Sequence, residues 1–428
     1  MKSLDQKLAD IRNQPSSRTF ILADAKDADM AFGVHAPGPR NHLSPRGPHR
    51  AQFSPEIWTR EEFGHRNLPE FMDLIRDVVD QAKVDIMLMS ASVNERLAIQ
   101  EGIFRHSTVT PAARANDTSD VWVVRHGKYL DHPSQPFRSA SIPHIQCGRQ
   151  HCPSVAGEFP GANLGLYSIT FLNDPVRDLA ALQAFKEFRA EAEEKGFRYF
   201  LEVFDPNIAS GIDPDKLGAF VNDSIVRSLA GVTDAGRPLF LKIAYHGPRF
   251  MEELAQYDPK LIVGILGGSA GTTHDAFQLI HDAQRYGARV ALFGRKINNA
   301  EHQLAFIEML RLITDGRASP KEAVQAYHAI LGRLGIRPNR PLDQDLALTH
   351  QALNYGGRTR VISAGAASPA APPPPPAKDK SPPPPADASA AVAGGSRAEQ
   401  SRGVPDFAAM KPPERAAYHA ERLRRRFG

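Results

Sequence analysis

Residues 239–295 contain three short apolar runs, LFLKIA at 239–244, LIVGIL at 261–266 and RVALF at 289–293, separated by longer segments of helical pattern. Runs rich in Val, Ile, Leu and Phe are typical of parallel strands, which are buried on both faces. The alternation of such strands with helices predicts an α/β fold with a parallel sheet. This stretch therefore sets the interpretation of the rest of the chain.

The same alternation extends toward the N-terminus and gives eight candidate strands over about 300 residues, the size of a (β/α)8 TIM barrel. The candidate strands are 19–23, 85–89, 121–124, 165–171, 199–204, 239–244, 261–266 and 289–293. Helices are expected at 68–82, 179–195, 215–229, 273–286 and 300–313. An open doubly wound sheet is the main alternative, but no G-x-G-x-x-G opens a helix. We predict a (β/α)8 barrel.

The barrel is expected at 17–315, after an N-terminal helix at 1–16 and before a helical extension at 316–362. Residues 363–403 are mostly Ala, Pro, Ser and Gly, a composition that cannot bury enough apolar surface to fold. We expect a disordered linker there, partly polyproline II. Residues 404–428 predict a short amphipathic basic helix that starts near Pro412 and Pro413.

The composition excludes several classes of protein. No apolar stretch is long enough for a transmembrane helix, and the polar N-terminus lacks the apolar core of a signal peptide. The net charge of +4 is modest, and no nucleic-acid-binding motif is present. Cys147 and Cys152 are the two cysteines, which suits a reducing cytoplasm rather than a disulfide framework. Their spacing with His144 and His151 matches no zinc signature, so a loop is favoured over a metal site.

Lys242 lies inside the apolar run at 239–244. A charged lysine in a buried strand is costly unless a partner neutralises it. Burial lowers the pKa of an amine, and a neutral amine is the nucleophile that attacks a carbonyl. The strand alone leaves two interpretations open: a Schiff-base nucleophile, or a lysine paired with a carboxylate at a strand end.

Two strand ends that follow Lys242 have the composition of an anion site. Gly267 and Gly268 follow the run at 261–266, and Gly294 and Arg295 follow the run at 289–293. Glycine lets backbone N–H groups approach an anion, and arginine adds a charged contact. Barrels often bind phosphate after strands seven and eight. We expect phosphate binding by these four residues, which favours the nucleophile interpretation of Lys242.

The stretch from Lys242 to about Asn298 resembles the archaeal-type class I fructose-bisphosphate aldolases, within the deoxyribose-phosphate aldolase superfamily. Lys242, Tyr245 and Gly247 match the family's Lys-x-x-Tyr-x-Gly motif on strand six. The glycine pair at 267–268 matches the family's Gly-Gly after strand seven. The resemblance covers roughly the last third of the barrel.

Two other family motifs match only in part. The family has Gly-Arg-Asn after strand eight, where this chain has Gly294, Arg295 and Lys296. The family's first strand ends in Leu-Asp-His-Gly, of which only the aspartate has a counterpart here, Asp24. The resemblance implies that Lys242 forms a Schiff base and that the glycines and Arg295 hold a substrate phosphate.

The family's tyrosine acid on strand five has no counterpart in residues 199–205. Glu202 is the natural substitute as proton carrier, with Asp205 as an alternative, because a carboxylate in an apolar strand has a raised pKa. A purely structural ion pair of Glu202 with Lys242 or Arg125 stays open. Asp24 would act in carbinolamine steps or orient Lys242, and Tyr245 would be an acid/base or a wall residue.

We therefore predict a class I aldolase, a carbon–carbon lyase that acts on a phosphorylated ketose such as a fructose bisphosphate. Its catalytic residues are Lys242, Glu202, Asp24 and Tyr245. The imine is the electron sink, so the prediction invokes no metal or other cofactor. Two alternatives remain: another phosphate-binding barrel enzyme, such as an isomerase or a thiolase-like relative, or a non-catalytic barrel that binds a partner through its tail.

Two peripheral segments complete the predictions. The stretch 33–50 is rich in His, Arg and Pro, and is either a lid over the site or a solvated loop. The tethered tail helix resembles the encapsulation peptides that load enzymes into bacterial microcompartments. We expect a cytoplasmic homo-oligomer with no nucleic-acid or membrane partner, and a microcompartment shell is the hypothesis for a tail partner.

Overall fold

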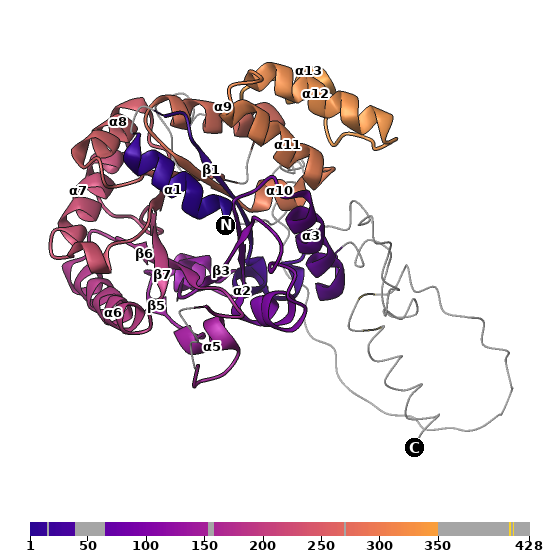
Figure 1. The fold of residues 1–428 in the computed structure, drawn as a ribbon. Helices are drawn as coiled ribbons and strands as arrows, with labels where there is room; N and C mark the ends of the chain where they lie inside the picture. The colour runs from indigo at the N-terminus through magenta and orange to yellow at the C-terminus, as the bar shows by residue number, and fades with distance from the viewer. Residues whose placement is uncertain are drawn as a thin grey trace, which may run out of the picture. The chain divides into compact units, whose positions relative to one another are not determined.

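In the computed structural model, eight parallel strands close into a barrel in the order β1-β2-β3-β6-β7-β8-β9-β10, with β10 paired to β1 (Figure 1). The structure describes residues 1–14, 17–38, 65–152, 158–268 and 271–349, together with Lys411 and Glu414. The barrel strands are β1 (Ile21–Lys26), β2 (Ile86–Met89), β3 (Thr110–Arg114), β6 (Leu164–Thr170), β7 (Arg198–Phe204), β8 (Leu241–Ile243), β9 (Gly264–Leu266) and β10 (Val290–Phe293). The predicted (β/α)8 barrel is confirmed.

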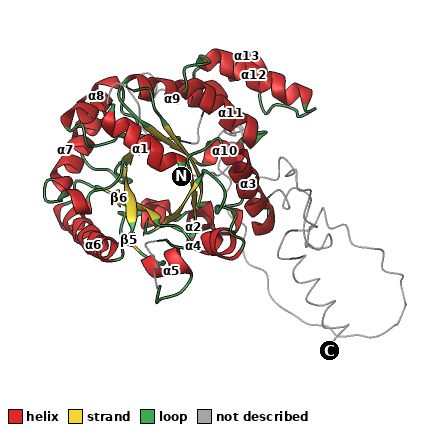
Figure 2. Cartoon of the chain, in the orientation of Figure 1, coloured by secondary structure: helices red, strands yellow, loops and turns green. Residues whose placement is uncertain are grey.

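Helices surround the barrel as an outer ring (Figure 2). The helices of the ring are α3 (Leu68–Gln81), α4 (Ala91–Asn94), α6 (Pro175–Glu194), α7 (Leu217–Leu229), α8 (Pro248–Tyr257), α9 (Thr273–Arg285) and α11 (Gln303–Thr314). Polar residues before them set their starts. Asn67 and Glu70 form a capping box on α3, and the Asp174 carboxylate accepts two backbone N–H groups of α6.

An N-terminal helix, α1 (Ser3–Asn13), lies across the barrel opening in Figure 1. Its Leu4, Leu8 and Ile11 side chains are buried in one cluster with the apolar side chains of alternate strand residues. Because strand side chains alternate between the two faces, this cluster identifies the strand positions that face the barrel interior. They are Ile21, Ala23, Ala25, Ile86, Leu88, Ala112, Leu164, Leu166, Phe200, Phe240, Ile262, Val290 and Leu292.

One predicted strand is wrong. Residues 121–124 form no strand, and the third barrel strand is β3 (Thr110–Arg114), which contains Pro111. Proline is rare in central strands because it cannot donate to the ladder. Here β3 pairs with β6 only from Ala113 onward, while Thr110 N donates to Asp85 O on the β2 side. The nitrogen of Pro111 therefore points to the β6 side of β3, where β3 has no β6 partner at this position. Proline costs no ladder hydrogen bond there.

The connection from β3 to β6 is long and carries small elements of its own. They are β4 (Asp117–Thr118) paired antiparallel with β5 (Pro136–Phe137), the turns η3 (Ser119–Val121) and η4 (Tyr129–Asp131), and α5 (Ile142–Cys147). Shorter elements elsewhere are α2 (Ala28–Phe32), η1 (Gly33–His35), the π-helical η2 (Glu95–Gln100), η5 (Pro214–Lys216), η6 (Asp234–Gly236) and α10 (Arg295–Asn299).

Beyond the ring, within the stretch 316–362 where a helical extension is predicted, the structure has α12 (Pro320–Arg333) and then α13 (Leu342–Asp345). Both lie outside the ring beside α9 and α11 in Figure 1. The predicted linker at 363–403 and tail helix at 404–428 lie outside the described residues, apart from Lys411 and Glu414. The predicted lid at 33–50 is described only as far as Gly38.

Cys147 and Cys152 form a disulfide, contrary to the expectation of two reduced thiols. The chain turns back after α5 at Gly148, whose φ of 72° is the left-handed conformation, and this brings the two Cα atoms to 5.6 Å. Neighbouring His144 shares a hydrogen bond with Ser141 Oγ at 2.6 Å.

Among the described helices, none combines the length and apolarity needed to cross a bilayer.

The contact of α1 with the barrel interior predicts a large loss of stability when one of the buried side chains of α1 is truncated. Leu4→Ala removes a fully buried side chain, and such changes cost roughly 2–5 kcal/mol. Chemical denaturation monitored by circular dichroism should show this loss. Val176→Ala, at a position 80% exposed, is the control and should change the free energy of unfolding by less than about 0.5 kcal/mol.

Candidate active site

A polar layer lies above the apolar interior, toward the carboxyl ends of the strands. In the barrel register Ser168, Glu202 and Lys242 sit side by side on β6, β7 and β8. Each follows an inward-facing apolar residue by two positions: Leu166, Phe200 and Phe240. The rings of Phe200 and Phe240 stack with centroids 4.6 Å apart. An apolar floor thus carries a polar layer at the end where barrels of this fold place their chemistry.

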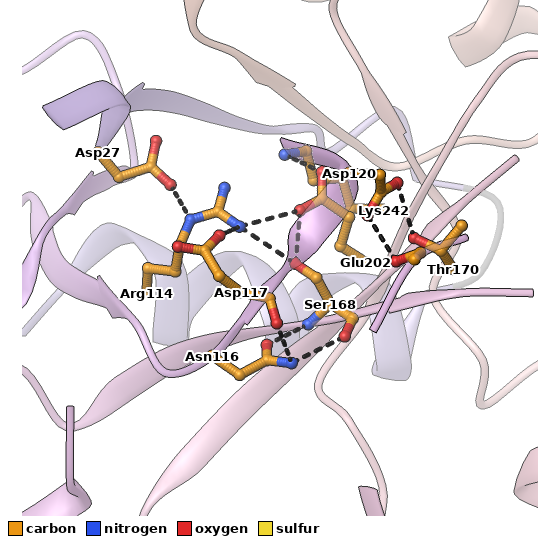
Figure 3. A network of polar contacts seen from close by, with 10 residues as sticks. Asp27, Arg114, Asn116, Asp117, Asp120, Ser168, Thr170, Glu202 and Lys242 are labelled. Carbon is orange, nitrogen blue, oxygen red and sulfur yellow. Dashed lines mark hydrogen bonds and ion pairs between the residues drawn. The ribbon is translucent and has the colours of Figure 1, made fainter. Parts of the chain in front are cut away.

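Lys242 and Glu202 form a buried ion pair at the centre of this layer (Figure 3). The Lys242 ammonium contacts Glu202 Oε1, and Ser168 Oγ donates to Glu202 Oε2 at 2.9 Å. Glu202 is 1% exposed and Lys242 is 7% exposed. Two charges this far from water are tolerated because they neutralise each other. The same contact gives the amine a carboxylate that can take its proton.

Arg114 binds the carboxylates of Asp27 and Asp117 beside the Lys242–Glu202 pair (Figure 3). Its Nε donates to Asp27 Oδ2 at 2.6 Å, and its Nη1 donates to Asp117 Oδ1 at 3.0 Å. The same Nη1 lies 3.3 Å from Ser168 Oγ and 3.9 Å from Glu202 Oε2. Arg114 therefore links the end of β1 to the Lys242–Glu202 pair through charge and hydrogen bonds.

Two further contacts hold the network to β6. The Asn116 side chain exchanges hydrogen bonds with both backbone groups of Ser168, at 2.6 and 2.9 Å. Asp120 accepts from Thr170 Oγ1 at 3.0 Å and from Ser134 Oγ at 2.6 Å. The loop after β3 is thus anchored on the upper part of β6, and Ser168 is fixed from both its backbone and its hydroxyl.

The charges of this cluster shift its proton affinities. Burial raises the pKa of Asp117 from its ordinary 3.8 to about 6, with Arg114 acting against the rise and Asp27 and Glu202 adding to it. Burial acts to lower the pKa of Arg114, but the three carboxylates raise it above its ordinary value. Asp117 therefore takes up a proton as the pH falls through about 6.

The predicted anion-binding residues follow β9 and β10. Gly268 has a φ of 59°, which a residue with a side chain rarely adopts. A Cβ on Gly294 would lie 3.2 Å from the Cβ of Ala25, so the backbone passes close to β1 there. Arg295 is partly buried and makes no hydrogen bond or ion pair with any described residue. Burial lowers the pKa of Arg295, and Glu202 acts in the opposite direction, which places Arg295 within the field of the polar layer.

Asp24 and Tyr245 are not brought together with Lys242. Asp24 faces the helices, on the side of β1 opposite to Ala23 and Ala25, and pairs with Lys26 at 2.8 Å with both side chains fully buried. Burial raises the pKa of Asp24 and lowers that of Lys26. Tyr245 packs in the hydrophobic cluster between strands and helices. Neither position supports the catalytic role expected of it.

Four residues of the layer were not predicted from the sequence: Asp27, Arg114, Asp117 and Ser168. The two-residue period of β1 could have found the first, because Asp27 continues the inward series of Ala23 and Ala25. Arg114 ends the strand that was misplaced, and Asp117 follows that strand. Asp205, the alternative proton carrier, accepts a hydrogen bond from Nε2 of His246 at 2.8 Å just beyond β7 and β8.

The sequence matches no protein-family model and no curated protein. Among solved structures it is similar to an archaeal fructose 1,6-bisphosphate aldolase, with 12% identity, a TM-score of 0.47, and coverage of 72% of this chain and 99% of that chain. A protein of Corynebacterium glutamicum gives 12% identity, a TM-score of 0.45, and coverage of 73% and 97%. Orotidine 5'-phosphate decarboxylase from Pyrococcus horikoshii gives 11% identity, a TM-score of 0.33, and coverage of 57% of this chain and 93% of that chain. At these identities the similarity concerns the fold alone.

The raised pKa of Asp117 predicts a pH-dependent effect of Asp117→Asn. A carboxyl group whose pKa rises from 3.8 to about 6 on folding destabilises the folded state above that range by up to roughly 3 kcal/mol. The variant should thus be more stable than the wild type at pH 7, and the gain should vanish as the pH falls from 6 toward 3.8.

Thermal unfolding across this pH range measures the difference. Asp213→Asn, which removes an exposed carboxylate paired with Lys216, is the control and should show no such trend. A gain for Asp117→Asn that stays constant from pH 7 to pH 4 would show that charge is not its cause.

Proposed function

We propose that this chain is a class I aldolase, which uses Lys242 to form a Schiff base with a phosphorylated ketose. The observation that carries the proposal is Lys242 itself. It is an inward-facing lysine on the sixth barrel strand, 7% exposed, and it contacts a carboxylate that can accept its proton. An amine in this position becomes the nucleophile once that proton moves to Glu202.

In the proposed reaction the neutral Lys242 amine attacks the ketone carbon to give a carbinolamine. Loss of water then gives an iminium, with the proton that water needs supplied by Glu202. The iminium accepts the electron pair of the adjacent C–C bond and becomes an enamine. The bond breaks as the hydroxyl of the departing carbon gives its proton to Glu202 and that carbon leaves as an aldehyde. Glu202 is the proton carrier, because it contacts Lys242 and is held by Ser168.

The phosphate part of the proposal rests on Arg295. Its guanidinium is partly buried next to the polar layer, and it is not engaged by any described residue. Together with the backbone of Gly268 and Gly294 it offers donors at the ends of the seventh and eighth strands. The N–H of Gly267 donates to the carbonyl of Leu292 at 3.0 Å, so Gly267 gives the phosphate room rather than a donor. A phosphate held there would fix the ketone against Lys242, which is the positioning part of the rate gain.

One observation favours a second candidate, a phosphate-binding barrel enzyme that moves protons without a covalent intermediate. Asp27, Arg114, Glu202 and Lys242 alternate in charge through direct contacts. A lysine held as an ammonium by Glu202 could act as a general acid in an isomerase or a related enzyme. The two candidates differ in whether Lys242 becomes covalently bonded to substrate.

Borohydride trapping separates them. Reduction in the presence of dihydroxyacetone phosphate or fructose 1,6-bisphosphate should add to Lys242 the mass of the ketose phosphate less one oxygen atom. Peptide mass spectrometry locates the adduct. Lys242→Met should abolish the adduct, while Lys260→Met, at a side chain 75% exposed, should leave it unchanged.

The absence of an adduct with any ketose phosphate, under conditions where these compounds bind, would exclude the aldolase and favour the second candidate. Glu202→Gln tests the proton carrier in the same assay. It should slow adduct formation by about 100-fold or more, because general acid–base groups contribute roughly that much.

The role of Arg295 predicts a change in affinity rather than in chemistry. Arg295→Met should raise KM for a phosphorylated ketose about 10- to 100-fold, since a hydrogen bond to a charged group contributes about 1.5–3 kcal/mol. Steady-state kinetics at saturating ketose should show kcat within about threefold of wild type. Arg333→Met on the exposed face of α12 is the matched control. An unchanged KM for Arg295→Met would remove Arg295 from the phosphate site.

A further inference from the structure

Residues 342–349, here called the C-terminal strap, run across the start of α9 and bind it through hydrogen bonds from four of its residues. Asp345 Oδ1 accepts from the backbone N of Thr273 at 2.7 Å. The carbonyl of Ala347 accepts from Thr272 Oγ1 at 2.7 Å, and the carbonyl of Leu346 accepts from His274 Nδ1 at 2.7 Å. The strap is therefore attached to the first turn of α9 by several hydrogen bonds, and Leu346 also packs against the hydrophobic core.

Thr349 completes the attachment. Its backbone N and its Oγ1 donate to the two carboxylate oxygens of Asp275, at 2.9 and 2.7 Å. Asp275 Oδ2 also accepts from the backbone N of Thr272 at 2.6 Å. On the other side, His328 Nε2 of α12 bonds Asp345 Oδ2 at 2.9 Å. Asp345 and Asp275 are each 3% exposed, so these bonds are shielded from water.

Two amides at the start of α9 are therefore occupied by carboxylates of the chain itself. Thr272 N donates to Asp275, and Thr273 N donates to Asp345. The amino end of a helix attracts anions through these N–H groups and the helix dipole. In this barrel the Asp345 carboxylate occupies the anion position at the start of α9. A substrate phosphate would therefore bind the loop glycines and Arg295 instead.

The same corner of the chain is held from the direction of β10. Lys296, the neighbour of Arg295, donates from Nζ to the carbonyls of Gly271 and Thr272 at 2.7 and 3.1 Å. Burial, with the nearby Arg340, lowers the pKa of Lys296 to about 8. The chain that leaves β9 with Gly267 and Gly268 thus reaches α9 at Gly271 and Thr272. Lys296 bonds both of these residues, and the strap bonds Thr272.

We propose that Asp345 is a positioning residue for the anion site: through the strap it fixes the start of α9, and thereby the loop that carries Gly267 and Gly268. Asp345 does not touch substrate. It acts through Thr273, and its loss leaves the loop free to move away from Arg295. The proposal rests on the proposed phosphate site, and it assigns to the C-terminal extension a function that the barrel alone would lack.

The experiment measures three quantities in Asp345→Ala, Asp345→Asn, Thr349→Val and wild type. They are hydrogen–deuterium exchange of residues 271–277, the affinity for inorganic phosphate, and KM and kcat for the ketose phosphate. Asp343→Ala is the matched control, because Asp343 is an exposed carboxylate of the same strap. Thr349→Val keeps the experiment informative if Asp345→Ala fails to fold, because it removes one hydroxyl contact to Asp275.

Asp345→Ala should speed exchange at residues 271–277 about tenfold, weaken phosphate binding about fivefold to tenfold and raise KM equally, with kcat unchanged. Asp345→Asn keeps an acceptor for Thr273 and should recover part of each effect, and Asp343→Ala should behave as wild type. Unchanged phosphate affinity and KM in Asp345→Ala and Thr349→Val would overturn the proposal, even if a Lys242 adduct forms. Faster exchange with weaker phosphate binding would support it, even if no adduct forms.

Discussion

The contact between Lys242 and Glu202 is the interaction on which the rest of the site depends. Both charges are removed from water, and such a pair is stable only where geometry and further hydrogen bonds compensate the lost solvation. Ser168 and Arg114 supply that compensation on the side of Glu202. With Asp27 and Asp117 included, three carboxylates surround the two cations, and burial raises the pKa of Asp117 to about 6. The site therefore holds several charges away from water.

The barrel provides for this pair by separating an apolar interior from a polar layer. Phe200 and Phe240 close the floor beneath Glu202 and Lys242, and α1 covers the opposite opening with leucine and isoleucine side chains. The pair thus lies toward the carboxyl ends of the strands, away from the opening that α1 covers. The proposed anion-binding residues lie at that same end, on the two strands that precede closure of the barrel onto β1. Substrate and proton carrier would meet where the fold leaves the pair accessible.

Much of this arrangement follows from pattern, and the failures have physical causes. Strands buried on both faces are continuous apolar runs, so seven of the eight were located. The strand at 110–114 escaped because Pro111 and two alanines lack the side chains typical of strands, while the Val-Trp-Val-Val run at 121–124 has them without forming one. Lys242 and Glu202 were found because a charge in an apolar strand stands out. Asp24 was expected in the site because it lies near the end of β1. Its side chain faces the helices, whereas Ala23 and Ala25 face the barrel interior. Proximity to a strand end does not determine which face a residue occupies.

A covalent bond between Lys242 and a ketone carbon is the step that defines the proposed aldolase. Nuclear magnetic resonance tests for this bond directly with 15N-lysine-labelled protein and dihydroxyacetone phosphate labelled with 13C at the carbonyl. We expect a new carbon resonance with one-bond coupling to nitrogen in the wild type, absent in Lys242→Met. A ketone resonance that broadens on binding, yet shows no carbon–nitrogen coupling in the wild type, would contradict the proposal.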